Sequence, residues 1–348
     1  MLGFESIIDQ DRSIRILTTF LQKGTIPHAL LFSGIEGVGK ENAAVAFAMA
    51  CNCSGEISES DAEQEDTRSD GHPDTDNRPK TDRPCGRCKS CRKINSDNHP
   101  DIIRVKPSGA FIKIDQIRAL CQTLAMKPYE ASIRVVIISD AQAMNPAAGN
   151  ALLKALEEPP GRTILILVTT RASDLLPTVV SRCQPIRFKP ISRQSLESVL
   201  IREHGFDSEG AAVIAAMAGG SMSRALRMHR NNWISRRNWL IGELESLSGG
   251  PVNRLLALAN QLSKEKDELP DTLEVIKSWF RDLVIAQLHP DKLLNQDLAS
   301  TLQQISRKTS LISLLSKFEA IQSTQTAIQA GTHIRLAMET MLLKLSRI

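Results

Sequence analysis

The sequence predicts an α/β protein built on a parallel sheet of the phosphate-binding-loop type, followed by a small helical lid and an all-α domain. Short apolar segments alternate with helical segments through the first 190 residues. A glycine-rich pattern follows the first of these apolar segments, and leucine-rich helical patterns fill the later residues. The 348 residues are 42% hydrophobic and 24% charged, which suits a globular chain of two or three domains.

The glycine-rich pattern lies between a predicted strand and a predicted helix, as a phosphate-binding loop requires. Residues 28–33 form the apolar strand segment, and the alanine-rich residues 42–51 suit the helix. The candidate phosphate-binding residues are Gly34, Gly37, Gly39, Lys40 and Glu41.

Glu41 departs from the pattern at the position where Ser or Thr ligates Mg²⁺. A carboxylate has a longer side chain than a hydroxyl residue, and its negative charge would lie beside the triphosphate. We therefore expect the loop to bind ATP or ADP weakly or not at all.

Residues 54–84 form an acidic insertion. They contain ten acidic and four basic residues, a charge of −6, and because the whole chain carries +4, the other residues carry +10. With one Ile as its large apolar residue, the insertion cannot offset the entropy of ordering, so we expect it to be disordered. The basic remainder favours a polyanionic partner.

A cysteine cluster with metal-ligand spacing follows the insertion. Its members, in a Cys-x2-Cys-x2-Cys run, are Cys85, Cys88 and Cys91. In a reducing cytosol this spacing favours zinc over disulfides. A tetrahedral site needs a fourth ligand, for which Cys53 is the expected residue, Cys51 a competitor and His99 a more remote one. The alternatives are a cysteine knuckle without metal and an iron–sulfur site.

Strands and helices continue to alternate after the cysteines. Residues 101–105 and 133–138 are predicted strands, separated by an amphipathic helix around residues 114–124. The second strand ends at Ser139 and Asp140, where phosphate-loop ATPases carry an Asp–Glu pair that holds Mg²⁺ and polarises water. Loss of that Asp, together with Glu41, predicts little or no turnover.

A predicted helix that starts near Pro146 ends at two prolines, Pro159 and Pro160, and leads to a strand over residues 163–168. Thr169 closes that strand, where its hydroxyl can sense a γ-phosphate or bond the loop backbone. Arg182, in the segment after it, is the residue of this region that we single out as a functional candidate. The alternative for Arg182 is a salt bridge on a turn.

Together these motifs resemble the bacterial DNA polymerase III clamp loader subunits of the AAA+ superfamily. The resemblance covers roughly the first 190 residues, through residues 28–40, the cysteine knuckle, His99-Pro-Asp101, residues 150–160 and Ser181-Arg-Cys183. Within the family, gamma and tau motor subunits keep complete ATP motifs, whereas delta-prime subunits often have degraded ones. The chain is most similar to the delta-prime type, and Trp279 to Leu283 adds to that similarity.

The resemblance implies that Arg182 is an arginine finger, acting in trans at the ATP site of a neighbouring motor subunit. It implies Zn²⁺ on the cysteines, and gamma/tau subunits, the delta subunit, the sliding clamp and primed DNA as partners. The complex is part of a DNA-directed DNA polymerase, a nucleotidyltransferase, and the chain's own ATPase would be weak or absent. The alternative is an active gamma/tau-like ATPase motor that uses Lys40, Asp140 and Glu41.

The expected domains are an AAA+ nucleotide-binding-like domain over residues 1–190, a helical lid over 191–230 and a helical collar over 231–348. Arg224, in the lid, lies one place from the second sensor arginine of the motor subunits. No apolar leader or 18-residue apolar stretch is present, so we expect a cytoplasmic protein with no membrane contact.

Overall fold

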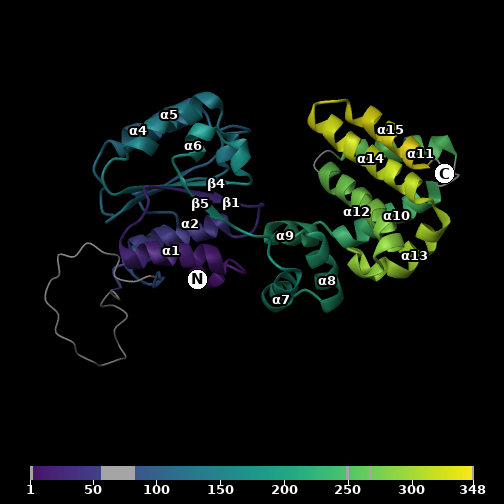
Figure 1. Ribbon diagram of the computed structural model, residues 1–348, viewed down its shortest axis with the longest axis horizontal. Helices are drawn as coiled ribbons and strands as arrows, with labels where there is room; N and C mark the ends of the chain where they lie inside the picture. Colours follow the sequence, from purple (N-terminus) through teal and green to yellow (C-terminus); the bar gives the residue numbers. More distant parts are fainter. Residues whose placement is uncertain (1–2, 56–82, 248–250, 266–267, 347–348) are drawn as a thin grey trace. The chain divides into compact units, whose positions relative to one another are not determined.

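A computed structural model describes most of the chain (Figure 1). The described residues are 3–55, 83–247, 251–265 and 268–346. The acidic insertion predicted at residues 54–84 lies almost entirely outside them. The chain divides into two compact units, of which the first is Met1–Ser195 with Gly220–Ser223 and the second is Leu196–Gly219 with Arg224–Ile348.

The first unit is built on a parallel five-stranded sheet, in the order β2-β3-β4-β1-β5 among the described residues. The strands are β1 (Ala29–Ser33), β2 (Ile102–Val105), β3 (Arg134–Ile138), β4 (Thr163–Thr169) and β5 (Gln184–Arg187). Strands β3 and β4 are buried at every residue, because a parallel sheet is covered on both faces and its central strands are therefore continuously apolar. The predicted α/β sheet is confirmed.

Helices cover both faces of this sheet, which gives three layers (Figure 1). One side carries α1 (Asp11–Lys23) and α2 (Lys40–Cys51), with α3 (Lys89–Asn95) against α2; the other carries α4 (Ile114–Leu124), α5 (Pro146–Glu157) and α6 (Pro177–Val180). Short 3-10 helices are η1 (Phe4–Ser6), η3 (Ala141–Ala143) and η4 (Ala172–Asp174). Leu30 and Phe32 of β1 join the core beneath α2, and Leu31 joins the core beneath α5, as the two-residue side-chain period of a strand dictates.

The strand register separates two edges of the sheet. Ser33 of β1 pairs with Thr169 of β4, so the loops that follow these strands meet at the carboxyl edge. Gln184, the first residue of β5, pairs with Leu30 near the start of β1. Residues just before β5, including Arg182, therefore lie at the amino edge.

A buried ion pair fixes the loop between α4 and β3. Asp101 and Arg134 are both buried, with 3.5 Å between Arg134 Nη2 and Asp101 Oδ1. The Asp101 carboxylate accepts three backbone N–H bonds of 2.7 to 2.8 Å, and Arg134 Nη1 donates to backbone carbonyls at the end of α4. The amide donors belong to Tyr129, Glu130 and Ala131. One carboxylate thus organises the whole turn.

Replacing Asp101 with Asn should lower the free energy of unfolding by about 3 kcal/mol, because Arg134 would lose its buried partner. Burial raises the pKa of Asp101, but its three N–H donors and Arg134 outweigh burial and lower the pKa below 3.8. The stabilisation is therefore present above pH 4 and disappears as the pH falls through the folded-state pKa. Urea denaturation at pH 7 and at pH 3 measures both effects, and equal stability of the two proteins at pH 7 would contradict the assignment.

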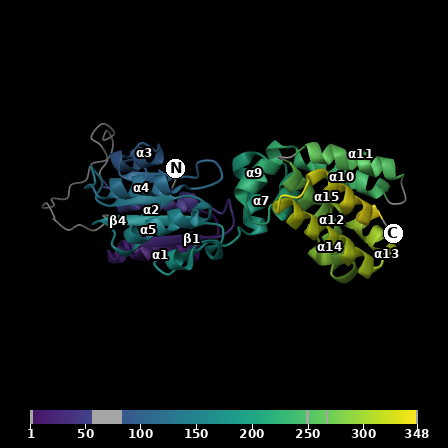
Figure 2. The same cartoon turned by 90° about the horizontal axis from the view of Figure 1, so that it is seen from above.

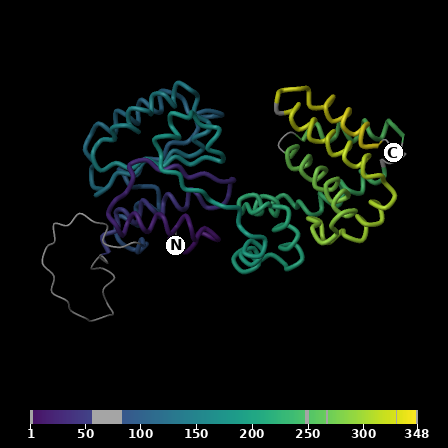
Figure 3. The backbone as a smooth tube through the Cα atoms, viewed as in Figure 1, coloured from purple at the N-terminus to yellow at the C-terminus, as the bar shows by residue number. Residues whose placement is uncertain are grey.

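Helices are the only regular secondary structure among the described residues of the second unit, and Figure 3 traces its backbone. Its helices are α7 (Arg193–His204), α8 (Ser208–Met217), α9 (Met222–Arg230), α10 (Trp233–Leu247), α11 (Val252–Lys264), α12 (Leu269–Leu288), α13 (Ala299–Lys308), α14 (Leu311–Gln329) and α15 (Ile334–Ser346), with short turns η5 (Pro290–Lys292) and η6 (Gln296–Leu298). The first residues of α7 and α9 belong to the first unit. Helices α10 to α15 pack as a bundle in which α12 contacts α13 and α14, and α15 contacts α11 and α14 (Figure 2).

Two fully buried charged residues hold the connection after α12. Asp282 accepts hydrogen bonds from the backbone N–H and side-chain amide of Asn295 at 2.7 and 2.8 Å. Arg237, on α10, donates to Asn295 Oδ1 at 3.1 Å and forms an ion pair with Asp297. These charges support the bundle. No helix in the described ranges has the length and apolar character needed to cross a membrane.

Candidate functional site

The phosphate-binding loop runs from β1 to α2 at the carboxyl edge, and its lysine is turned back onto the loop. Lys40 is 7% exposed, and its Nζ donates to the carbonyl oxygens of Gly34 and Ile35, both at 2.6 Å. The pKa of Lys40 is lowered, because burial outweighs the negative charges of Asp140, Glu36 and Glu41, which raise it. Two of the three N–H bonds of the ammonium group thus bind loop carbonyls where a nucleotide phosphate would compete for them.

A second segment of the first unit, residues 220–223, packs directly on this loop. The backbone N–H of Met222 donates to the carbonyl oxygen of Gly37 at 3.0 Å. Gly37 has a φ of +77°, and a Cβ at this position would lie 2.2 Å from Ser223 Oγ and 2.5 Å from Ser221 Oγ. Only glycine fits this approach. Sequence analysis did not predict the contact, although the two glycines before Ser221 are a signal for close backbone packing.

The other predicted nucleotide-site residues lie around the loop without forming a complete Mg²⁺ site. Glu41 is exposed on the first turn of α2. Asp140 is exposed, adopts a left-handed conformation with φ of +49°, and accepts a 3.0 Å hydrogen bond from Gln142 Nε2. Thr169 donates to the carbonyl oxygen of Arg171 at 3.0 Å, which is the loop-bonding role considered as the alternative to phosphate sensing.

The remaining nucleotide-site candidates divide between the two units. Gly34 and Gly39 take up the left-handed φ values of +152° and +90° that the loop requires. Arg224, proposed as a second sensor, belongs to the second unit.

Arg182 lies at the opposite edge of the sheet from this loop. It follows α6 and precedes β5, whose register places it beyond the start of β1. The three residue steps from Leu30 to Ser33 alone separate the two edges by roughly 10 Å. Arg182 therefore lies at the other end of the strands from the chain's own phosphate loop.

The guanidinium group of Arg182 is held by Glu157, the last residue of α5. Nε and Nη2 of Arg182 lie 2.8 and 2.6 Å from Glu157 Oε1, and Nη1 donates to the carbonyl oxygen of Thr178 at 3.0 Å. The arginine side chain is 36% exposed. Glu157 was not predicted as a site residue from the sequence; the one signal for it is its position at the end of a helix, at the same edge of the sheet as Arg182.

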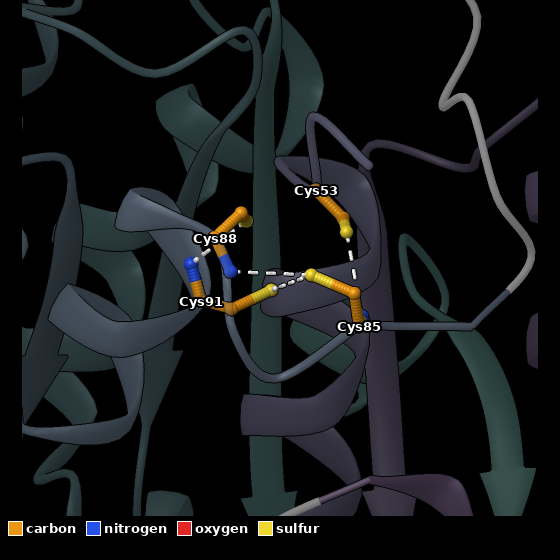
Figure 4. Close-up of side chains that lie close together, drawn as sticks. All are labelled: Cys53, Cys85, Cys88 and Cys91. Carbon is orange, nitrogen blue, oxygen red and sulfur yellow. Dashed lines mark hydrogen bonds between the residues drawn. The ribbon is translucent and has the colours of Figure 1, made fainter. Parts of the chain in front are cut away.

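Four cysteine side chains point toward one another beside α3 (Figure 4). The set is Cys53, Cys85, Cys88 and Cys91. Their sulfur atoms all lie within 4.8 Å of one another. Four thiolates around one zinc ion at Zn–S distances of 2.3 Å would lie about 3.8 Å apart, so a small contraction of this cluster gives a tetrahedral site.

Backbone N–H groups surround these sulfur atoms. Cys85 N lies 3.4 Å from Cys53 Sγ, Cys88 N lies 3.3 Å from Cys85 Sγ, and Cys91 N lies 3.5 Å from Cys88 Sγ. Burial raises the pKa of Cys88, but hydrogen bonds from Cys91 and Ser54 outweigh it and lower the pKa to about 6. Burial and the neighbouring Cys88 raise the pKa of Cys91, so within this pair the N–H donors favour thiolate, the form that binds metal, at Cys88.

The two competing ligands lie outside the cluster. Cys51 is buried within α2, and burial raises its pKa. His99 accepts a hydrogen bond from the backbone N–H of Asp101 at Nδ1, and its Nε2 lies 3.7 Å from Glu130 Oε1. Neither side chain is placed to serve as the fourth ligand, whereas Cys53 is.

Comparison with known families covers most of the chain. The model described as DNA polymerase III, delta subunit, matches residues 9–76 and 72–192. The model described as DNA polymerase III, delta subunit, C terminal, matches residues 231–347. Both compact units therefore contain residues that match models of the DNA polymerase III delta subunit.

Individual relatives agree with these matches. The DNA polymerase III subunit delta' of Bacillus subtilis (strain 168) is 29% identical over 341 residues, which cover 97% of this chain and 96% of that protein. The subunit delta' of Pseudomonas aeruginosa is 30% identical over 264 residues, covering 75% and 71%. The subunit tau of Bacillus subtilis is 26% identical over 367 residues, covering 98% of this chain and 61% of that protein.

Proposed function

This chain belongs to the DNA polymerase III delta subunit family and is a delta'-like clamp loader subunit, and from that premise we propose that it is a non-hydrolysing stator. As a stator it would assemble with gamma/tau and delta subunits in the cytoplasm and help to load the sliding clamp on primed DNA. Its contribution to chemistry would be Arg182, supplied in trans to the motor subunit's ATP site, within an AAA+ assembly.

The observation that carries the proposal is that the lysine of the phosphate loop already donates its hydrogen bonds to carbonyl oxygens of the same loop. A nucleotide would have to displace the bonds from Lys40 to the Gly34 and Ile35 carbonyls and the packing of Ser221 and Ser223 on Gly37. It would regain little, because Glu41 and Ser139 replace the two Mg²⁺ contacts that normally stabilise the transferred phosphoryl group. The loop then serves as part of the fold.

The position of Arg182 supports action on a neighbour. A guanidinium group at the amino edge cannot reach the chain's own loop at the carboxyl edge, but it can be presented to another subunit. Its planar set of N–H donors matches phosphate oxygens better than an ammonium group does. Charge developing on the transferred phosphoryl group is the charge that such a residue stabilises.

For the cysteine cluster we propose structural Zn²⁺, held by Cys53, Cys85, Cys88 and Cys91. Four thiolates leave zinc no open position, so the ion would stabilise the fold and would not activate water. Three of the four cysteines are buried in the core that also contains α2. The metal would join the end of α2 to the start of α3 on either side of the acidic insertion.

The isolated chain should neither bind nor hydrolyse Mg²⁺-ATP. We expect no heat of binding in calorimetry up to about 1 mM ATP, a limit that corresponds to a binding free energy weaker than about −4 kcal/mol. The motor subunit from the same cell is the positive control. Tight, Mg²⁺-dependent binding with turnover would instead support the alternative of an active gamma/tau-like motor.

A further inference from the structure

We propose that Glu157 is a positioning residue for Arg182: it holds the guanidinium group by one edge so that the remaining N–H donor, on Nη2, faces a neighbouring subunit's nucleotide. This inference rests on the proposed role of Arg182 in trans. The Glu157 carboxylate would orient the Arg182 guanidinium group in advance. The residue pair lies at the amino edge of the sheet, between the end of α5 and the turn after α6.

The hydrogen-bond geometry leaves part of the guanidinium group available. Glu157 Oε1 engages the Nε side of the group, at 2.8 Å from Nε and 2.6 Å from Nη2. Nη1 is oriented by the Thr178 carbonyl at 3.0 Å and by Ser181 Oγ at 3.4 Å. Arginine has five N–H donors, and no contact within the described residues uses the second N–H of Nη2.

Both ends of the pair are anchored in the core. Leu156, beside Glu157, is fully buried, and Cys183, beside Arg182, is 8% exposed. The main chain of both residues is therefore fixed while the charged groups remain at the surface. Only the side-chain torsions of Arg182 are free to vary, and Glu157 restricts them.

Restricting those torsions has a kinetic consequence. A free arginine side chain loses its rotamer freedom when it binds phosphate, whereas one that is already oriented loses less. The benefit appears in the step in which phosphoryl charge develops, so it should affect kcat and leave the KM for ATP unchanged. A residue that supported only the fold would give no such separation.

The chain supplies a matched control in the next residue. Glu158 is also an exposed carboxylate at the end of α5, but Glu157 is the one that contacts Arg182. Substitution of either residue by Gln removes one negative charge from the same place. A difference between the two variants therefore reports the contact with Arg182 and not the local charge.

The test is steady-state ATP hydrolysis by the clamp loader reconstituted with its motor subunits and this chain. At the motor site that this chain serves, we expect Glu157→Gln to lower kcat about three- to ten-fold with KM unchanged, and Glu158→Gln to match the wild type. In the Glu157→Gln, Arg182→Ala double variant, kcat should equal that of Arg182→Ala alone, because a positioning residue has no effect once its target is gone.

Wild-type kcat for Glu157→Gln, or a loss that adds fully to that of Arg182→Ala, would overturn the positioning role. An equal loss for Glu158→Gln would overturn it as well, because charge alone would then explain the effect. If Arg182→Ala itself leaves hydrolysis unchanged, the proposed trans role fails, and that result is distinguishable from failure of the role of Glu157.

Discussion

Replacing Arg182 with Ala should lower ATP hydrolysis at the motor site that this chain serves by about 1,000-fold, the lower end of the range for arginine fingers. Total ATP hydrolysis by the complex should therefore fall by at least the fraction that this one motor site contributes. Pre-steady-state hydrolysis in the reconstituted complex measures it. The cause is loss of the guanidinium donors where phosphoryl charge develops, and Arg182→Lys should restore little because an ammonium group lacks the planar donor pair.

Assembly should be unaffected by the same substitution. The Arg182–Glu157 pair is at the surface, where ion pairs contribute about 0 to 1 kcal/mol, so the variant should fold and enter the complex normally. Arg202→Ala is a suitable control, since Arg202 is also an exposed arginine paired with a glutamate, Glu203, at 3.3 Å. Full hydrolysis with Arg182→Ala in a correctly assembled complex would remove the trans role.

Replacing Cys91 with Ser should abolish stoichiometric zinc binding and lower the melting temperature by about 10 °C. Structural zinc sites in small peptides contribute about 10 to 16 kcal/mol of apparent binding energy, and a loss of 3 to 5 kcal/mol gives a shift of about this size in a domain of 150 to 250 residues. Cys91 is fully buried, so no water can replace its ligand bond. Elemental analysis and thermal unfolding measure the two effects.

Cys121→Ser is the control for this second prediction. Cys121 lies on α4, half-buried and outside the four-cysteine cluster, with its Sγ 3.9 Å from the carbonyl oxygen of Ala151. That variant should keep one zinc ion per chain. Purified wild-type protein without zinc, or Cys91→Ser with full zinc content and unchanged melting, would contradict the proposed metal site.

Prediction from the sequence succeeded for those parts of the fold that depend on patterns of neighbouring residues. Continuous apolar segments predicted β1, β3 and β4, because a strand covered on both faces has no solvent side to encode. The bounds of α5 followed from its local signals: Asn145 caps the helix by accepting from Ala148 N, and the helix ends at Glu157, before two prolines. The cysteine spacing likewise predicted a cluster that the structure brings together.

The contacts that sequence missed join residues distant in the chain. The bond from Met222 N to the Gly37 carbonyl spans 185 residues, and the pair Arg182 and Glu157 spans 25. No periodicity or motif specifies such a pair, since each depends on how strands and loops pack in three dimensions. Glu41 and Ser139 predicted a weakened nucleotide site from their positions in the ATP motifs, and the structure adds the packing of residues 220–223 on the phosphate loop.

We propose that the working group of this chain is Arg182 and not its own phosphate loop. One comparison tests it most directly: ATP hydrolysis by complexes in which this chain alone carries either Lys40→Met or Arg182→Ala, each checked for assembly. We predict hydrolysis at the wild-type level with Lys40→Met, and with Arg182→Ala a severe loss at the motor site that this chain serves. Loss with Lys40→Met and none with Arg182→Ala would contradict the account and identify the chain as a motor.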